Sequence, residues 1–281
     1  MTFRRSLSQL ALPLVAGVWI GLGLAGMDRG EPARKSAAVP DPLPAVGGSN
    51  GWSQHAPGPP LSSDPGGVPA QARIRANVPT QFKPDVESPR VDAHAFLDPF
   101  SSVIGDVEIG AGVYVAPFAS VRGDEGQPIH IGNGSNLQDG VVIHGLETLS
   151  QGEPVPEHSY TVQGKRYAVY VGERVSLAHQ SQIHGPAWIE DDVFVGMQAL
   201  IFKAHVGKGV VVEPGATIIG VTVAAGRYVP ARAVVMTQEA AERLPEITYS
   251  YGLRAINQSM VRANRSLAES YAGSAPSAPA R

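Results

Sequence analysis

The segment VGERVSLAHQSQIHGPAWIEDDVFVGMQALI, from Val171 to Ile201, carries an apolar residue at every sixth position. The repeat residues are Val171, Leu177, Ile183, Ile189, Val195 and Ile201. An amphipathic helix spaces its apolar residues at three and four, and a half-buried strand spaces them at two. A strict period of six is instead typical of a stacked coil, in which each hexad forms one short strand and one corner. The segment therefore predicts a mainly β, parallel coil.

The same period recurs on both sides of this segment. An earlier run of hexads begins at residue 91, breaks at RGDEGQPIH, and then resumes, with repeat residues Val91, Leu97, Val103, Ile109, Val115, Val121, Ile131, Leu137 and Ile143. A long excursion from Gly145 to Ala168 follows, and beyond Ile201 the period shifts by one residue at Val206 and continues through Val212 and Ile218. Small or β-branched residues, which fit a tight corner, stand four positions after the first five repeat residues: Ala95, Ser101, Val107, Val113 and Ala119.

Composition and charge exclude several classes of function. A chain of 281 residues is long enough for one domain with extensions. Its 22 basic and 25 acidic residues give a net charge of -3, without the basic excess expected of a nucleic-acid-binding protein. Because the chain has no cysteine, disulfides, thiolate catalysis and cysteine-ligated metal sites are excluded.

The two ends of the chain predict segments outside the coil. Residues 1–26 combine two arginines with an apolar run, which predicts a signal peptide or, alternatively, an uncleaved N-terminal anchor. Residues 27–76 are rich in Pro, Gly, Ser and Ala and predict a disordered linker. We expect the coil at 77–237, a helical segment at 238–271 and a flexible tail at 272–281. The protein is then periplasmic or extracellular, and contacts a membrane only if the first segment stays uncleaved.

Three of the eight histidines are candidate metal ligands. His144 and His184 each directly follow a repeat isoleucine, so they occupy the same hexad position and point the same way. His179 belongs to a preceding hexad and to a different face, so two neighbouring copies bring the three together more readily than one coil does. Three imidazoles suit zinc, and also iron(II) or cobalt(II). The plainer alternative is that all three are ordinary polar residues of the coil wall.

Other polar residues cluster near His144 along the sequence. Three come from the break in the repeat and three flank the His144 hexad: Arg122, Asp124, Glu125, Asn136, Gln138 and Glu147. A solvated break with surface charges is one interpretation. The other is a polar site in which Glu147, at the start of the excursion, accepts or passes a proton.

Several long motifs bear a family resemblance. RGDEGQPI, SNLQDGVVIHGLET, RYAVYVG, VSLAHQSQIHGPA, VGMQALIFKAHVG and GRYVPA follow one another along the chain. Together they resemble the gamma-class carbonic anhydrases, and closely the prototype subfamily, from about Asn77 to Tyr271.

The resemblance implies a left-handed β-helix of triangular cross-section, with a C-terminal helix alongside, assembled as a homotrimer. It also implies a metal at each subunit interface, held by His144 and His184 of one chain and His179 of its neighbour. The activity implied is the reversible hydration of carbon dioxide to bicarbonate.

The same resemblance implies roles for seven further residues. Arg122 and Asp124 match a pair that bridges neighbouring subunits. The others match polar residues of the catalytic site: the glutamate Glu125, the orienting amides Asn136 and Gln138, the proton shuttle Glu147, and Asn257 near the substrate. The loop after Glu147 is shorter and less acidic than in the family's prototype, which bears on the route of proton export.

Two other functions fit the same fold. A non-catalytic scaffold subunit would keep the coil, but relatives of that kind usually lose the ligands or the surrounding glutamates, which this chain retains. A hexapeptide-repeat acyltransferase would use one histidine as a base, yet the sequence offers no dedicated feature for acetyl-CoA.

Overall fold

The computed structural model describes residues 73–150 and 152–274 of the chain. The predicted signal or anchor segment, nearly all of the predicted linker and most of the predicted tail lie outside these residues. Within the described residues, neither helix is long and apolar enough to cross a membrane.

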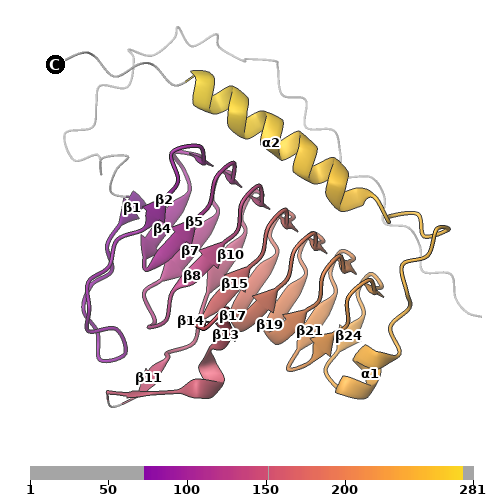
Figure 1. Ribbon diagram of the computed structural model, residues 1–281, viewed down its shortest axis with the longest axis horizontal. Coiled ribbons are helices and arrows are strands. Elements are labelled where there is room, and N and C mark those ends of the chain that lie inside the picture. Colours follow the sequence, from indigo (N-terminus) through magenta and orange to yellow (C-terminus); the bar gives the residue numbers. More distant parts are fainter. Residues whose placement is uncertain (1–72, 151, 275–281) are drawn as a thin grey trace, which may run out of the picture. The chain divides into compact units, whose positions relative to one another are not determined.

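The hexads form short strands that stack in parallel as successive turns of a left-handed β-helix (Figure 1). Each repeat residue pairs with the repeat residue of the next turn: Val121 lies opposite Ile143, and Ile143 opposite Ile183. This register follows from the pattern, because a slip of one residue would turn every buried side chain outward. The predicted mainly β coil is confirmed.

The strands form three faces. The first face contains β1 (Ile74–Arg75), β4 (Ser102–Gly105), β7 (Ser120–Gly123), β10 (Val142–His144), the first parts of β17 (Gln182–Ile189) and β19 (Leu200–Val206), β21 (Thr217–Ile219) and β24 (Val234–Val235). The second contains β2 (Arg90–Val91), β5 (Val107–Ile109), β8 (Ile129–Ile131), β15 (Val169–Val171), the later parts of β17 and β19, and β22 (Thr222–Val223). The third is a seven-stranded sheet of β3 (Phe96–Leu97), β6 (Tyr114–Val115), β9 (Asn136–Leu137), β16 (Ser176–Leu177), β18 (Phe194–Val195), β20 (Val211–Val212) and β23 (Tyr228–Val229).

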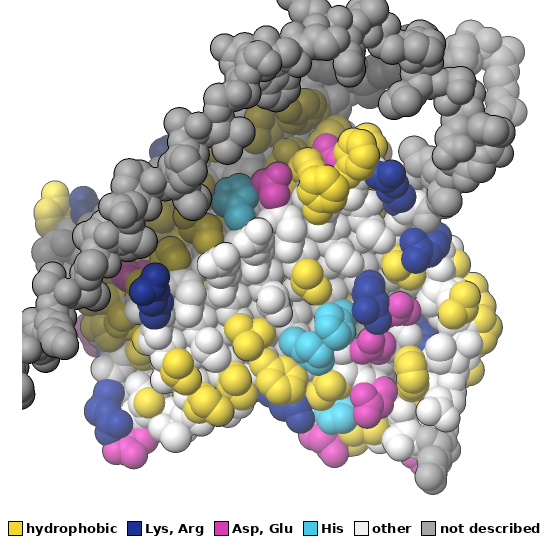
Figure 2. Space-filling model, turned by 180° about the vertical axis from the view of Figure 1, so that it is seen from behind, with side chains coloured by type: hydrophobic (Ala, Val, Ile, Leu, Met, Phe, Trp, Pro, Cys, Tyr) yellow, Lys and Arg dark blue, Asp and Glu magenta, His cyan; other side chains and the backbone are white. Residues whose placement is uncertain are grey.

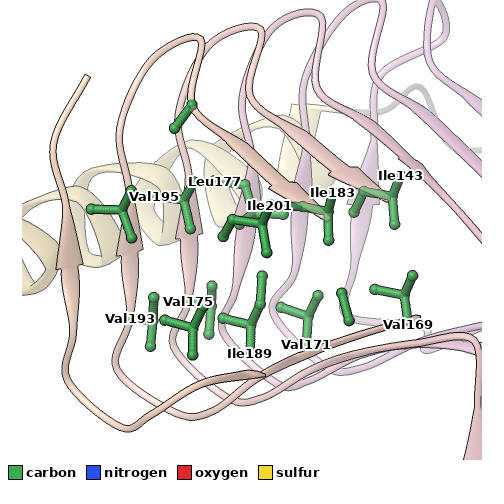
Figure 3. Close-up of a cluster of buried hydrophobic side chains, with 14 of the residues drawn as sticks. Ile143, Val169, Val171, Val175, Leu177, Ile183, Ile189, Val193, Val195 and Ile201 are labelled. Atoms are coloured by element: carbon green, nitrogen blue, oxygen red, sulfur yellow. The ribbon is translucent and has the colours of Figure 1, made fainter. Parts of the chain in front are cut away.

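The repeat residues fill the inside of the coil. Ile143, Leu177 and Ile189 are fully buried, and Figure 3 shows aliphatic side chains from successive turns stacked in rows between the strands. Burying one such side chain contributes about 2 kcal/mol to stability. Small residues such as Ala119 and Ala199 are buried at the corners, where a larger side chain would not fit. The coil is therefore a stiff scaffold whose outward side chains have defined positions.

The excursion between β10 and β15 forms two hairpins and a short helical turn. These are β11 (Leu149–Ser150) with β12 (Glu153–Pro154), the 3-10 helix η2 (Pro156–His158), and β13 (Tyr160–Val162) with β14 (Lys165–Tyr167). Tyr160 packs against Trp188 on the second face, at 6.1 Å between ring centroids, and Lys165 forms a salt bridge to Glu108 on the same face. These contacts hold the excursion against the coil rather than leaving it extended in solvent.

Two helices, α1 (Gln238–Glu242) and α2 (Ile256–Ser274), follow the last strand, and α2 packs along the third face (Figure 1). Ala268 of α2 is buried against Tyr114. The predicted helical segment 238–271 is not helical throughout, because the residues after Tyr251 form tight turns in which the Ile256 N–H donates to the Leu253 carbonyl. The coil also starts earlier, since Ile74 of β1, inside the predicted linker, pairs with Val103.

Candidate functional site

His144 and His184 lie side by side on two paired strands of the first face. His144 is the last residue of β10, and it stands directly opposite His184 of β17 in the next turn. Their ring centroids are 4.2 Å apart, which is close to the spacing of paired strands. Figure 2 shows histidine side chains gathered beside acidic and basic side chains on one face of the molecule.

Both rings are fixed by the backbone of the following residue. His144 Nδ1 lies 3.1 Å from the Gly145 carbonyl oxygen, and His184 Nδ1 lies 3.0 Å from the Gly185 carbonyl oxygen. A carbonyl only accepts, so each Nδ1 carries the hydrogen and a neutral ring leaves the lone pair of Nε2 free. A Cβ at position 185 would stand 2.6 Å from the Ala168 carbonyl oxygen, so only glycine fits where the excursion rejoins the coil.

His179 occupies the opposite edge of the first face, at the corner that joins the third face to the first. Its Nδ1 lies 3.0 Å from Oδ2 of Asp139, which again leaves Nε2 free. Sequence reasoning missed Asp139 as the residue that orients this ring. A signal was present, because Asp139 follows Leu137 by the same two residues by which His179 follows Leu177.

The three histidines do not meet within one chain. Across residues 73–150 and 152–274, no group of three His, Cys, Asp or Glu side chains is placed to hold a metal ion. Their donor chemistry nevertheless fits a divalent metal, because all three rings present a free Nε2 and a hydrogen-bonded Nδ1, the usual state of a metal-ligating histidine.

Arg122, Asp124 and Glu125 form an ionic cluster beside His144. Arg122 stands opposite His144 in the preceding turn, and its guanidinium lies 3.4 Å from Asp124 and 2.9 Å from Glu125. The other oxygen of Glu125 lies 3.6 Å from His144 Nδ1. Burial raises the pKa of Glu125, but the adjacent His144 imidazole and the Arg122 guanidinium lower it by more, so the net shift is downward. Glu125 is therefore ionised at neutral pH.

Asn136 and Gln138 lie toward the edge of the face that carries His179. Asn136, on β9, donates to Ser176 Oγ at 2.9 Å, and Gln138 Nε2 donates to Asn136 Oδ1 at 3.1 Å. Both amides are buried, so these bonds fix which way each side chain points. Gln138 directly precedes Asp139, which places the pair of amides with His179 rather than with His144.

Glu147 and Asn257 occupy different surroundings. Glu147 is exposed, three residues after His144, and its backbone carbonyl accepts a hydrogen bond of 2.7 Å from His158 Nδ1. Asn257, on α2, donates to the Arg174 carbonyl at 2.8 Å. Arg174 lies at the corner between the second and third faces, so Asn257 is separated from both histidine edges of its own chain.

Comparison with known proteins places the chain among relatives of one kind. No family profile matches it. It is 51% identical over 201 residues to a carbonic anhydrase of Methanosarcina thermophila, covering 71% of this chain and 81% of that protein. It is 37% identical over 132 residues to the mitochondrial gamma carbonic anhydrase 2 of Arabidopsis thaliana, covering 47% of this chain and 41% of that protein.

Two other similarities are to proteins named for different roles. A carboxysome assembly protein, CcmM of Nostoc, is 42% identical over 193 residues, which cover 67% of this chain but 33% of that protein. A Bacillus cereus structure assigned as an acetyltransferase superposes with a TM-score of 0.50 at 20% identity, covering 66% of this chain and 93% of that one. The latter likeness shows the coil fold alone. With half of its aligned residues identical to a carbonic anhydrase over most of that enzyme's length, the chain belongs to the gamma-class carbonic anhydrase family.

Proposed function

We propose that this protein catalyses the reversible hydration of carbon dioxide to bicarbonate and a proton, at metal sites shared between copies of the chain. His144 and His184 of one copy and His179 of a second copy would hold the metal. The observation that carries the proposal is that all three rings have Nδ1 bonded to a fixed acceptor and Nε2 free, at the two edges of one face.

The corner that carries His179 supports the shared site. Large apolar side chains project from the same corner in other turns, and Phe118 and Met197 are 71% and 45% exposed. Such exposed apolar side chains are typical of a surface that another protein covers.

The residues around the histidines have complementary roles in this proposal. Zinc held by the three histidines would supply a nucleophile at neutral pH, because it lowers the pKa of bound water from about 15.7 to about 7. Asp139 and the two glycine carbonyls hold the three rings in one tautomer and orientation. Glu125, ionised and beside His144, accepts a hydrogen bond from water or substrate. Asn136 and Gln138 orient the reactants with amides that are themselves held in place.

Each turnover also releases one proton that must leave the site. Glu147 is suited to carry it, because its carboxylate is exposed on the loop that starts three residues after His144. Asn257 would approach the substrate only from another copy, since it lies at the third corner of its own chain. Zinc is the metal we propose, with iron(II) or cobalt(II) as alternatives that imidazole ligands also accept.

A second candidate is a scaffold role without catalysis. It is favoured by the similarity to CcmM, which is named for carboxysome assembly and matches 67% of this chain. The ionic cluster and all three histidines are retained here, so we place catalysis first.

The predicted signal peptide adds a proposal about location. If residues 1–26 direct export, the reaction takes place in the periplasm or outside the cell. Cell fractionation with N-terminal sequencing of the mature protein tests this, and a cytoplasmic protein with an intact N-terminus would contradict it.

The function is tested by measuring metal content and carbon dioxide hydration on one anaerobically purified sample. We expect one metal per chain, with hydration lost on chelation and regained with zinc or iron(II). His179→Ala should lose both metal and activity, and a fully active, fully loaded variant would refute the site. Metal at full occupancy without hydration would favour the scaffold.

A further inference from the structure

One histidine of the excursion lies against the strand that carries His184. His158 is the last residue of η2, which packs against β17, and its side chain is half-buried. Its Nδ1 lies 2.7 Å from the carbonyl oxygen of Glu147. The carboxylates nearest to it in sequence belong to Glu157 and Glu153, which are both exposed, and among the described residues no acidic side chain forms an ion pair with His158.

The hydrogen bond to Glu147 determines which nitrogen of His158 can take up a proton. A carbonyl oxygen accepts only, so Nδ1 carries the hydrogen, and Nε2 is the basic atom of the neutral ring. When Nε2 is protonated, the Nδ1 hydrogen bond becomes charge-assisted and therefore stronger. The ring can gain and lose a proton at Nε2 without losing its contact to the backbone.

The backbone next to Glu147 is held on its other side as well. Thr148 is 1% exposed, its N–H donates to the Glu125 carbonyl at 3.0 Å, and its hydroxyl accepts from the Gln127 N–H at 2.7 Å. The Thr148 carbonyl accepts from the Val155 N–H at 2.8 Å, which closes the loop that leads to His158. The Glu147 backbone and the His158 ring are thus kept together at the point where the excursion leaves the first face.

We propose that His158 is a proton-transfer residue, which takes the proton of hydration from the Glu147 carboxyl group at Nε2 and passes it to buffer in solution. The O–H bond of Glu147 breaks as the Nε2–H bond forms, and the resulting imidazolium then gives the same proton to a buffer base. Nothing is oxidised or reduced. Imidazole exchanges protons efficiently near neutral pH, where free carboxylates are almost wholly ionised. The inference rests on the proposed function, because it needs hydration to supply the proton.

The test uses the full, metal-loaded protein in weak and strong buffer. His158→Asn keeps an N–H donor for the Glu147 carbonyl but cannot carry a proton. We expect kcat in weak buffer to fall by about tenfold, with kcat/KM unchanged, because proton export follows the hydration step. Millimolar imidazole should restore kcat. Adding Glu147→Ala should lower kcat no further than Glu147→Ala alone, since both residues act on one route.

His94→Asn is the matched control. His94 is also bonded through Nδ1 to a fixed acceptor, Asp92, at 3.0 Å, but it lies in the first turn of the coil, away from the excursion. Its substitution should leave kcat unchanged in both buffers. A hydrating wild type with an unaltered His158→Asn variant would overturn the inference and leave the proposed function standing. So would a loss of kcat/KM that imidazole does not rescue, since that marks a positioning role. A metal-loaded wild type without hydration would refute the proposed function itself.

Discussion

Mixing two inactive variants should produce active enzyme. His144→Ala removes a ligand from one edge of the first face, and His179→Ala removes the ligand from the other edge. Each variant alone should lack every site, because each shared site needs both edges. Where the His144 edge of a His179→Ala chain meets the His179 edge of a His144→Ala chain, however, all three ligands are present.

The expected recovery follows from the geometry of a ring. In a cyclic trimer every interface joins one edge of a copy to the opposite edge of the next. A trimer that contains both variants, in either ratio, has one interface in which the two intact edges meet. Co-expressed chains carrying two different tags, purified through both, should therefore show about a third of the wild-type hydration rate and about one metal per trimer.

Stopped-flow hydration and metal analysis on the doubly tagged oligomer measure this directly. A chain carrying both His144→Ala and His179→Ala, co-expressed with either single variant, is the control, because no interface in that oligomer joins two intact edges. The substituted side chains are partly exposed, so melting temperatures near that of the wild type are expected for every variant. Mixed oligomers without activity, or a single variant with wild-type activity, would refute the shared site.

Three further predictions concern the ligand geometry, the charges and the core. Asp139→Asn removes the carboxylate that orients His179, and metal affinity should fall by about 10-fold or more in chelator competition; an unchanged affinity would argue against that role. Burial raises the pKa of Glu108, but hydrogen bonds from Lys165 and other partners lower it from 4.5 to about 2. This shift stabilises the fold above pH 4.5 and is lost as the pH falls toward 2, so Glu108→Gln should reduce the difference in urea midpoint between pH 7 and about pH 3. Ile183→Ala leaves a cavity inside the coil and should cost about 2–5 kcal/mol in urea unfolding, whereas a cost near zero would mean that the core collapses around the gap.

The coil could be predicted from the sequence because its register is local. Each hexad brings its own buried residue, and strands of consecutive turns pair without any long connection, so Ile143 and Ile183 meet as the period requires. The neighbouring His144 and His184 follow from the same rule. The start of the coil at Ile74 was not predicted, because β1 carries no run of hexads and is held only by its pairing with β4.

The contacts that the excursion makes could not be predicted from the hexad period, because the excursion carries no hexads. The hairpin of β13 and β14 is positioned by the tilted contact of the Tyr160 ring with Trp188 and by the salt bridge between Lys165 and Glu108, both between residues distant in sequence. The role inferred for His158 depends on this folding, since only the hairpin arrangement brings its ring to the Glu147 carbonyl. The sequence predicted only that a long excursion separates two runs of hexads.

The division of the site between two edges follows from the hexad itself. A residue directly after a first-face repeat residue, such as His144, points outward from the first face. A residue two positions after a third-face repeat residue, such as His179, lies at the corner that leads from the third face to the first. His144 and His179 are therefore kept at opposite edges by the same period that builds the core. Because the backbone sets the separation between His144 and His179, rotating their side chains does not bring the two rings together. In the proposed site, three histidines arranged in this way meet only when one copy presents its corner to the first face of another, so the proposal requires that metal binding depend on assembly.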